Sequence, residues 1–214
     1  MQIASGDLHH GTIKSEHYAS YCVPASTPAD DDNASLIVYA SRYGATQGIA
    51  ERIVGPLREQ GSAVTVQPAV QAADPSAYEV VVIGSATYFG HWMKPATEYV
   101  RCHQSVLAYR AVWLFSSGRL GTLTQDAQGK DIRDGAEPKE IVEFRQSIQP
   151  RDHHVFFGAL DPGKLKFTHS LLLKLPANKD NVLFPVGDFR DWNEVDSWSQ
   201  RIIQSLPDAV ETHT

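Results

Sequence analysis

Five short apolar runs, rich in β-branched and aromatic residues, alternate with helix-like segments from Ser35 onward, and this alternation limits the possible folds more than any other feature. The runs lie at 35–41, 63–68, 79–84, 110–116 and 154–159. Runs that are apolar at nearly every position are typical of strands covered on both faces. Strands that alternate with crossover helices form a mostly parallel sheet with right-handed connections. The sequence therefore predicts an α/β domain over 35–207: a doubly wound, five-stranded parallel sheet with helices on both faces.

Helical spacing fills the intervals between the runs. Apolar residues recur at every fourth position over 49–57, and a helix over 95–107 opens with proline at a favoured first position. A third helix is predicted near Pro138 and a last one from Asp191, whose spacing to Glu194 is that of a capping box. The interval QAADPSAY, between the second and third runs, is too short to predict a helix.

The ends of the chain read differently from the domain. Residues 1–34 are rich in His, Ser, Asp and Pro and lack apolar periodicity, so we expect a flexible tail there, and another over 208–214. The first tail carries one Lys against five acidic residues, which leaves only −2 of the total charge of −6 for the rest of the chain. A charge of −2 gives a weak field for steering a partner protein. We expect no nucleic-acid partner.

Cysteine usage and hydropathy bear on the compartment. Cys22 and Cys102 show no CxxC or Cys/His spacing, so we expect neither a disulfide framework nor a zinc site. The histidine pairs at 9–10 and 153–154 lack a third ligand at a suitable spacing, which predicts no metal site. No apolar run approaches the ~18 residues of a spanning helix. We therefore expect a cytoplasmic protein.

The loop SRYGAT, residues 41–46, follows the first apolar run directly. Ligands of open α/β sheets bind at the carboxyl ends of strands. Successive backbone N–H groups, a flexible Gly44 and the hydroxyls of Ser41 and Thr46 can hold a phosphate at the positive end of the following helix. The alternative is an ordinary polar turn with Thr46 as the helix N-cap. Neither a Walker loop nor GxGxxG is present, which favours a mononucleotide that needs no Mg²⁺.

Two further loops follow the third and fourth runs: GSATYFGHW over 84–92 and SSGRLG over 116–121. Small residues let the backbone approach the edge of a flat ring, and aromatic residues can cover its face. Taken singly, such aromatic residues are more often wall or core. Three loops of this kind on one sheet edge favour a ring-binding site.

These motifs resemble those of flavodoxin-like FMN domains over residues 35–207. The Ser-x-x-Gly-x-Thr loop at Ser41, Gly44 and Thr46 is the signature of that family. The chain is most similar to the branch of menaquinone-dependent protoporphyrinogen dehydrogenase, through Gly84, Ser85, Tyr88, Phe89, Gly90 and His91, through Phe156 or Phe157 with Gly158, Ala159 and Leu160, and through Asp191 and Trp192. The resemblance implies the strand order 2-1-3-4-5, with FMN at the ends of strands one, three and four. Tyr43 stands where many flavodoxins have Thr, which implies one fewer side-chain contact with the phosphate.

The resemblance also implies a set of cofactor-binding residues. Ser41, Arg42, Tyr43, Gly44, Ala45 and Thr46 are expected at the phosphate, Ala86, Thr87, Tyr88, Phe89 and Gly90 along the ring, and Ser117 and Gly118 at its other edge. Tyr88 is the expected stacking residue. His91 is a weak catalytic candidate, since a proton relay and structural packing against Trp92 both account for it, and packing is the favoured interpretation.

Three functions are compatible with these features. The leading interpretation is an FMN-dependent oxidoreductase that passes electrons to or from a quinone or porphyrinogen-like substrate. The second is a one-electron carrier flavodoxin, which the weak charge of the domain disfavours. The third is a flavin-free interaction protein on the same fold.

Residues 164–185 form an insertion before the last helix, because simple α/β connections use about two to six residues. The segment carries four Lys against one Asp and a possible apolar stripe at Phe167, Leu171 and Leu175. It could cover the sheet edge, with its lysines in water. Alternatively it could bind an anionic or quinone-bearing membrane as a peripheral contact.

Overall fold

The computed structural model describes residues 33–121, 125, 128–131, 133, 135–164 and 185–206. The N-terminal tail up to residue 32, nearly all of the insertion and the C-terminal tail lie outside this range. The expectations about both tails and about the apolar stripe of the insertion therefore stay predictions.

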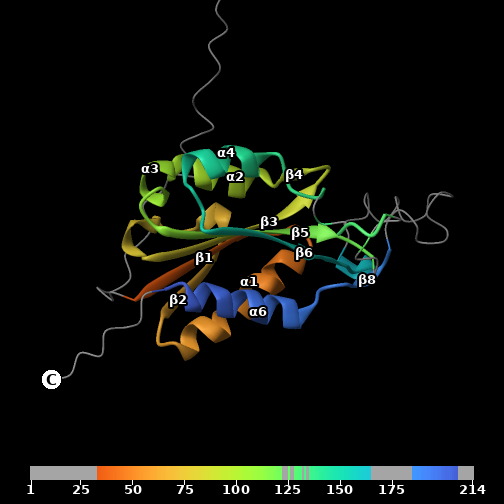
Figure 1. Ribbon diagram of the computed structural model, residues 1–214, viewed down its shortest axis with the longest axis horizontal. Coiled ribbons are helices and arrows are strands. Elements are labelled where there is room, and N and C mark those ends of the chain that lie inside the picture. The colour runs from red at the N-terminus through yellow and green to blue at the C-terminus, as the bar shows by residue number, and fades with distance from the viewer. Residues whose placement is uncertain are drawn as a thin grey trace, which may run out of the picture.

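Parallel strands form the middle layer of the molecule (Figure 1). Five of them follow the order β2-β1-β3-β5-β6, which confirms the predicted order 2-1-3-4-5 of the long strands. Their bounds are β1 Ala34–Ala40, β2 Ala63–Pro68, β3 Val80–Tyr88, β5 Ala111–Arg119 and β6 Asp152–Phe157. The short β4, His91–Trp92, pairs antiparallel with the end of β3.

Helices cover both faces of the sheet (Figure 1). Alternate residues of a strand point to opposite faces: Leu36 and Val38 enter the core under α2, α3 and α4, whereas Ile37 enters the core shared with α1 and α6. The bounds are α1 Ala45–Glu59, α2 Lys94–Cys102, α3 Gln104–Leu107, α4 Glu140–Ser147 and α6 Trp192–Gln204. The helix expected over 95–107 is thus divided at His103.

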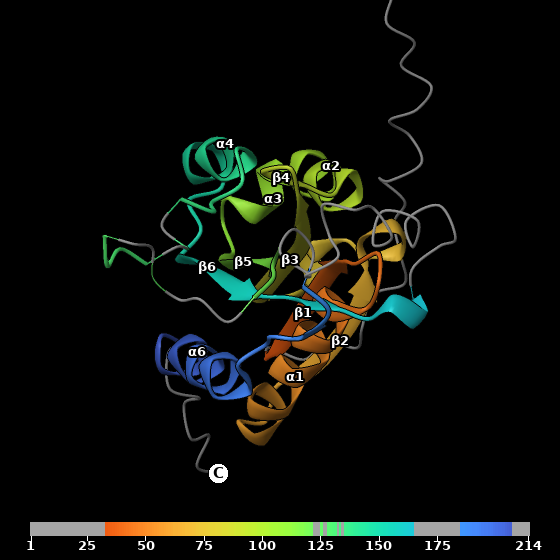
Figure 2. The same ribbon diagram turned by 90° about the vertical axis from the view of Figure 1, so that its right-hand side faces the viewer.

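The connections differ from simple crossovers in two places. Between β2 and β3 lie only two 3₁₀ turns, Ala69–Gln71 and Pro75–Ala77, in agreement with the short interval in the sequence. After β6 the chain crosses the carboxyl edge of the sheet (Figure 2) through β7, Ala159–Leu160, and a 3₁₀ turn, Pro162–Lys164. It returns as β8, Gly187–Asp188, which pairs antiparallel with β7. A small β-ribbon therefore joins the two segments that flank the insertion.

Cys102, the last residue of α2, is disulfide-bonded, and its partner lies outside the described residues. The expectation that cysteine spacing excludes a disulfide is wrong at this position. Sequence spacing has little power here because any two cysteines can meet once the chain folds back.

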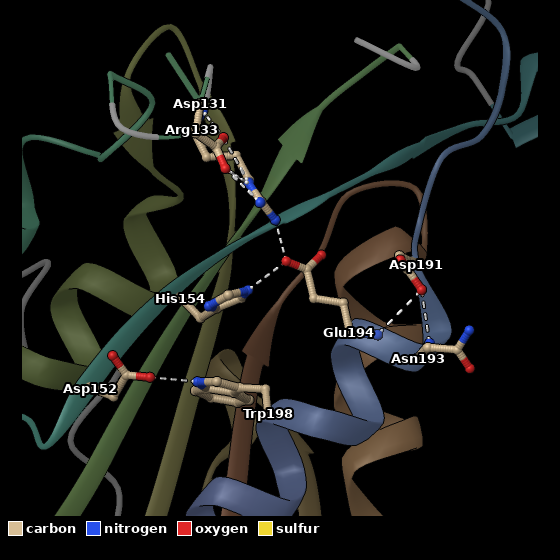
Figure 3. Close-up of polar contacts among 8 residues, drawn as sticks. All are labelled: Asp131, Arg133, Asp152, His154, Asp191, Asn193, Glu194 and Trp198. Atoms are coloured by element: carbon tan, nitrogen blue, oxygen red, sulfur yellow. Dashed lines mark hydrogen bonds and ion pairs between the residues drawn. The ribbon is translucent and has the colours of Figure 1, made fainter. Parts of the chain in front are cut away.

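A polar network joins the last helix to the sheet and to the loop before α4 (Figure 3). Asp191 caps α6 by accepting from the N–H groups of Asn193 and Glu194, which confirms the N-cap half of the predicted capping box. Glu194 binds both His154, at 3.0 Å from Nε2, and Arg133. Lower on the helix, Trp198 Nε1 donates to Asp152 at 2.7 Å. These contacts fix α6 beside β6.

Gly84 in β3 serves packing rather than ligand approach. A Cβ at this position would lie 1.9–2.4 Å from three atoms of the Phe115 ring, which is fully buried. We predict that Gly84→Ala destabilises the protein by about 1–3 kcal/mol through overpacking. Denaturant unfolding measures this cost. Phe115→Leu removes the ring that clashes, so the double variant should cost less than the sum of the two single variants; strictly additive costs would contradict the steric explanation.

Candidate functional site

Three segments meet at the carboxyl edge of the sheet, which faces the viewer in Figure 2. They are the 41–46 loop after β1, the turn between β3 and β4, and the end of β5. Thr46 Oγ1 lies 2.8 Å from Ser117 Oγ in a buried hydrogen bond. The Arg42 guanidinium lies over the Tyr88 ring at 5.2 Å from its centroid. The predicted cofactor residues of all three segments are thus brought together.

The 41–46 loop turns sharply into α1 at Gly44. Gly44 is the helix N-cap, with a left-handed φ of 90°, and its N–H donates to Ser41 Oγ at 3.0 Å. The alternative of Thr46 as N-cap is therefore wrong: Thr46 lies inside the helix with its side chain fully buried. The helical bond from Gly48 N–H to the Gly44 carbonyl spans the first turn. The N–H groups of residues 45–47 precede that bond, so they have no intrahelical acceptor and lie at the positive helix end.

The turn between β3 and β4 presents an aromatic residue to solvent. Tyr88 pairs with His91, and the two residues between them, Phe89 and Gly90, have φ of 53° and 76°. Two positive φ values in a two-residue hairpin are those of a type I′ turn. Phe89 is 98% exposed, and Lys139 N–H donates to the Gly90 carbonyl at 3.1 Å. A bulky residue in this conformation is uncommon, and such strain is concentrated at functional sites.

Tyr88 is partly buried beside this turn. Burial raises the pKa of its phenol, and the positive charge of Arg42 partly offsets this effect. Tyr88 is therefore neutral at physiological pH and is held against a cation. Its role as the stacking residue stays a prediction, and the exposed Phe89 is a second aromatic side chain at the same edge.

His91 has a carboxylate partner that the sequence did not reveal. Its Nδ1 lies 2.8 Å from Glu140 Oε1, and Glu140 Oε2 accepts from the Trp92 N–H at 3.1 Å. Burial acts to raise the pKa of Glu140, but these hydrogen bonds outweigh it and the pKa is lowered. Trp92, the residue on which His91 was expected to pack, packs on Phe144, with ring centroids 5.4 Å apart. The ionised Glu140 thus fixes Nδ1 of His91 and orients a ring whose side chain is 49% exposed.

A second histidine lies in a buried chain of hydrogen bonds under the site. Trp92 Nε1 donates to Ser116 Oγ at 2.7 Å, Ser116 Oγ lies 2.8 Å from His153 Nε2, and His153 Nδ1 lies 3.1 Å from Glu137 Oε1. The arrangement has the residue types of a hydrolytic triad. Ser116, however, is 1% exposed, so no substrate can reach its hydroxyl. These hydrogen bonds therefore fix β4 to β5 and to the start of β6.

His153 and His154 do not form a metal pair. As neighbours on β6 they point to opposite faces, His153 toward Ser116 and His154 toward Glu194. Within the described residues there is no cluster of three or more His, Cys, Asp or Glu side chains able to hold a metal ion. Those residues also contain no helix that is long and apolar enough to span a membrane.

A cavity of about 370 Å³ lies beside Gly44, between the 41–46 loop and the β7–β8 ribbon. Its walls carry two cationic side chains, Lys164 and Arg190. The Arg190 guanidinium reaches the Ala45 carbonyl at 3.3 Å and occupies the space that a Cβ on Gly48 would need. Sequence reasoning did not predict these two residues as part of the site, because only the crossing of the chain after β6 brings them there.

Comparison of the sequence with protein-family models identifies the family. A model described as a flavodoxin domain matches residues 36–181. The chain belongs to the flavodoxin domain family. No curated protein matches it.

The solved structures that match this chain include two with a TM-score of 0.51. The rubredoxin oxygen:oxidoreductase of Desulfovibrio gigas has a TM-score of 0.51 at 13% identity, and the match covers 88% of this chain and 38% of that one. A short-chain flavodoxin associated with a non-canonical PDU bacterial microcompartment also has a TM-score of 0.51 at 13% identity, over 80% of this chain and 97% of that one. The chain thus spans well under half of the oxidoreductase. Identities this low show a common fold alone.

The residues at the carboxyl edge fit the flavin that a flavodoxin domain implies. A Cβ on Gly118 would lie 2.7 Å from the Thr87 carbonyl, so only glycine allows β3 and β5 to approach this closely. Thr87 Oγ1 is buried and has no hydrogen-bond partner among the described residues. Gly44 and the helix end supply the N–H groups that suit a phosphate. The individual residues stay predicted contacts, and Thr46 and Ser117 already share one hydrogen bond with each other.

The buried His153 should make stability depend on pH. Burial lowers its pKa from 6.5 to about 4, against the opposing effect of Glu137. Because the unfolded state then binds more protons, stability should fall as the pH falls from about 6.5 toward about 4, by up to roughly 3 kcal/mol. Urea unfolding at pH 7, 6 and 5 measures the slope. His153→Gln should flatten it and His91→Gln should not; equal slopes in all three proteins would contradict the assignment.

Proposed function

We propose that the chain binds FMN non-covalently at the carboxyl edge and acts as an FMN-dependent oxidoreductase. The observation that carries the proposal is the left-handed Gly44 at the start of α1, joined through Thr46 and Ser117 to the end of β5. Backbone N–H groups of residues 42–46, apart from that of Gly44, which donates to Ser41 Oγ, would hold the phosphate. Residues 86–90 with Ser117 and Gly118 would line the ring. Bound FMN supplies hydride or single-electron transfer.

A quinone or porphyrinogen-like compound is the proposed electron partner. The motif resemblance to the branch of menaquinone-dependent protoporphyrinogen dehydrogenase supports it. The exposed Phe89 also supports it, because a flat apolar compound can pack on an aromatic face at this edge. Glu140 fixes Nδ1 of His91, so Nε2 is the nitrogen that would exchange a proton with the reduced or oxidised substrate.

A one-electron carrier is the second candidate. Membership of the flavodoxin domain family favours it. The charge of −2 outside the first tail speaks against docking to a strongly basic partner. Membrane contact through 164–185 stays a proposal that rests on sequence, since residues 165–184 lie outside the described range.

Titration with FMN tests cofactor binding directly. Wild-type protein should bind FMN and become yellow. Gly44→Val should reduce the affinity at least about hundredfold, because a β-branched residue is strained at positive φ and would displace the N–H groups. Gly61→Val is the matched control: Gly61 has a φ of 82° beyond the far end of α1, with no atom within 4 Å of its Cβ position. If the wild-type protein binds no FMN at high micromolar concentration, the proposal is wrong and a flavin-free interaction protein is supported.

Turnover separates an enzyme from a carrier. With FMN bound, reduced nicotinamide as donor and a soluble naphthoquinone as acceptor, the oxidoreductase should reduce many equivalents of quinone. A carrier, which depends on a separate reductase, should pass no more than the electrons it was loaded with. His91→Gln should lower the turnover number and alter its pH profile while FMN affinity stays unchanged, because the residue is assigned to proton transfer.

A further inference from the structure

Lys164 lies directly beside the turn at Gly44. It ends the 3₁₀ turn Pro162–Lys164, which follows the crossing of the chain after β6 (Figure 2). Its Nζ is 3.6 Å from the position that a Cβ on Gly44 would occupy, and both residues line the same cavity. From its position in the sequence, this lysine belongs to the insertion and is expected either in water over a covered sheet edge or in a peripheral membrane contact. In the structure its ammonium group instead faces the loop that carries the family's phosphate signature.

The other charges around this cavity are already compensated or directed elsewhere. Arg190 binds both carboxylate oxygens of Asp188, at 2.8 and 2.6 Å, and stacks on Trp192 at 4.4 Å from the ring centroid. Asp161 also lines the cavity, and its Oδ1 accepts from the Gly163 N–H at 2.9 Å. Lys164 has no carboxylate partner among the described residues, and the first turn of α1 contains no acidic residue. Among the described residues, Lys164 is therefore a cation without a carboxylate partner beside the positive end of a helix.

We infer that Lys164 is a phosphate-binding residue that makes this chain select FMN over riboflavin. The inference rests on the proposed FMN site. A phosphate monoester carries a charge of about −1.5 to −2 at pH 7. The partial positive charge at the helix end and the ammonium group of Lys164 would both attract it. Tyr43 stands where many flavodoxins have a Thr that contacts the phosphate. Lys164, which is distant in sequence, takes over part of the phosphate binding. The base of the insertion thereby becomes part of the cofactor site.

Paired titrations with FMN and riboflavin test this inference. Lys164→Gln should weaken FMN binding about three- to tenfold, the range of one partly exposed charge-assisted contact. Riboflavin lacks the phosphate, so its dissociation constant should be unchanged. The dependence of FMN affinity on salt should also become shallower, because one screened attraction has been removed. Lys164→Glu should weaken FMN further and still leave riboflavin unaffected.

Arg58→Gln is the matched control. Arg58 lies in the last turn of α1, the helix whose first turn lies beside Lys164. The variant therefore changes the net charge equally but at the opposite edge of the sheet. It should leave both dissociation constants unchanged. Equal losses for FMN and riboflavin in Lys164→Gln would mean a structural role, and no loss for FMN would overturn the inference. Either result leaves FMN binding by the wild type, and hence the proposed function, intact; failure of wild type to bind FMN would instead remove the proposed function.

Discussion

Burial of the sheet on both faces is the constraint on which the rest of the structure depends. Leu36 and Val38 enter one core and Ile37 enters the other, so β1 has no face left for solvent. Parallel strands of this kind carry apolar side chains at nearly every position and can expose polar groups only where they end. Ligand chemistry is therefore confined to the strand ends, and the carboxyl edge is the one at which helix N-termini add a positive field.

At that edge, buried serine hydroxyl groups lie between the apolar core and the candidate site. Ser85 accepts from the Met93 N–H, Ser116 from Trp92 Nε1, and Ser117 bonds Thr46. The bonds of Ser116 and Ser117 attach β5 to β4 and to α1, and the bond of Ser85 holds the residue before α2 against β3. Each contributes about 1 kcal/mol. Small side chains are needed here because the backbones lie so close. The loops are consequently ordered before any ligand arrives, which reduces the entropic cost of binding.

The features that depend on neighbouring residues could be predicted from the sequence. The strand order follows from alternating apolar runs together with the family signature, and the cap at Asp191 follows from spacing alone. Contacts between distant segments could not be predicted. Glu140 meets His91 across 49 positions, and Lys164 reaches Gly44 only because the chain crosses the sheet edge after β6. The disulfide at Cys102 could not be predicted for the same reason.

The helical N-cap shows how local reasoning can fail even within a motif. Thr46 has a favourable N-cap side chain, yet the cap is Gly44, because a left-handed residue lets the loop turn before the helix begins. The hydroxyl of Thr46 is then buried and bonds Ser117. The threonine of the motif therefore positions the loop in the absence of a ligand. A β-hairpin with Phe at its first turn position was missed for a similar reason: Asn, Asp and Gly are the usual residues there.

The distribution of charge bears on what approaches the site. Away from the carboxyl edge, carboxylates are neutralised in surface pairs such as Arg52 with Asp196 and Arg101 with Glu143. Such pairs contribute little to stability and cancel most of the long-range field. At the edge itself Arg42 lies on Tyr88 and Lys164 lies beside Gly44. The positive charges of Arg42 and Lys164 beside the 41–46 loop attract an anionic cofactor, whereas a charge of only −2 outside the first tail gives a basic protein partner little electrostatic attraction.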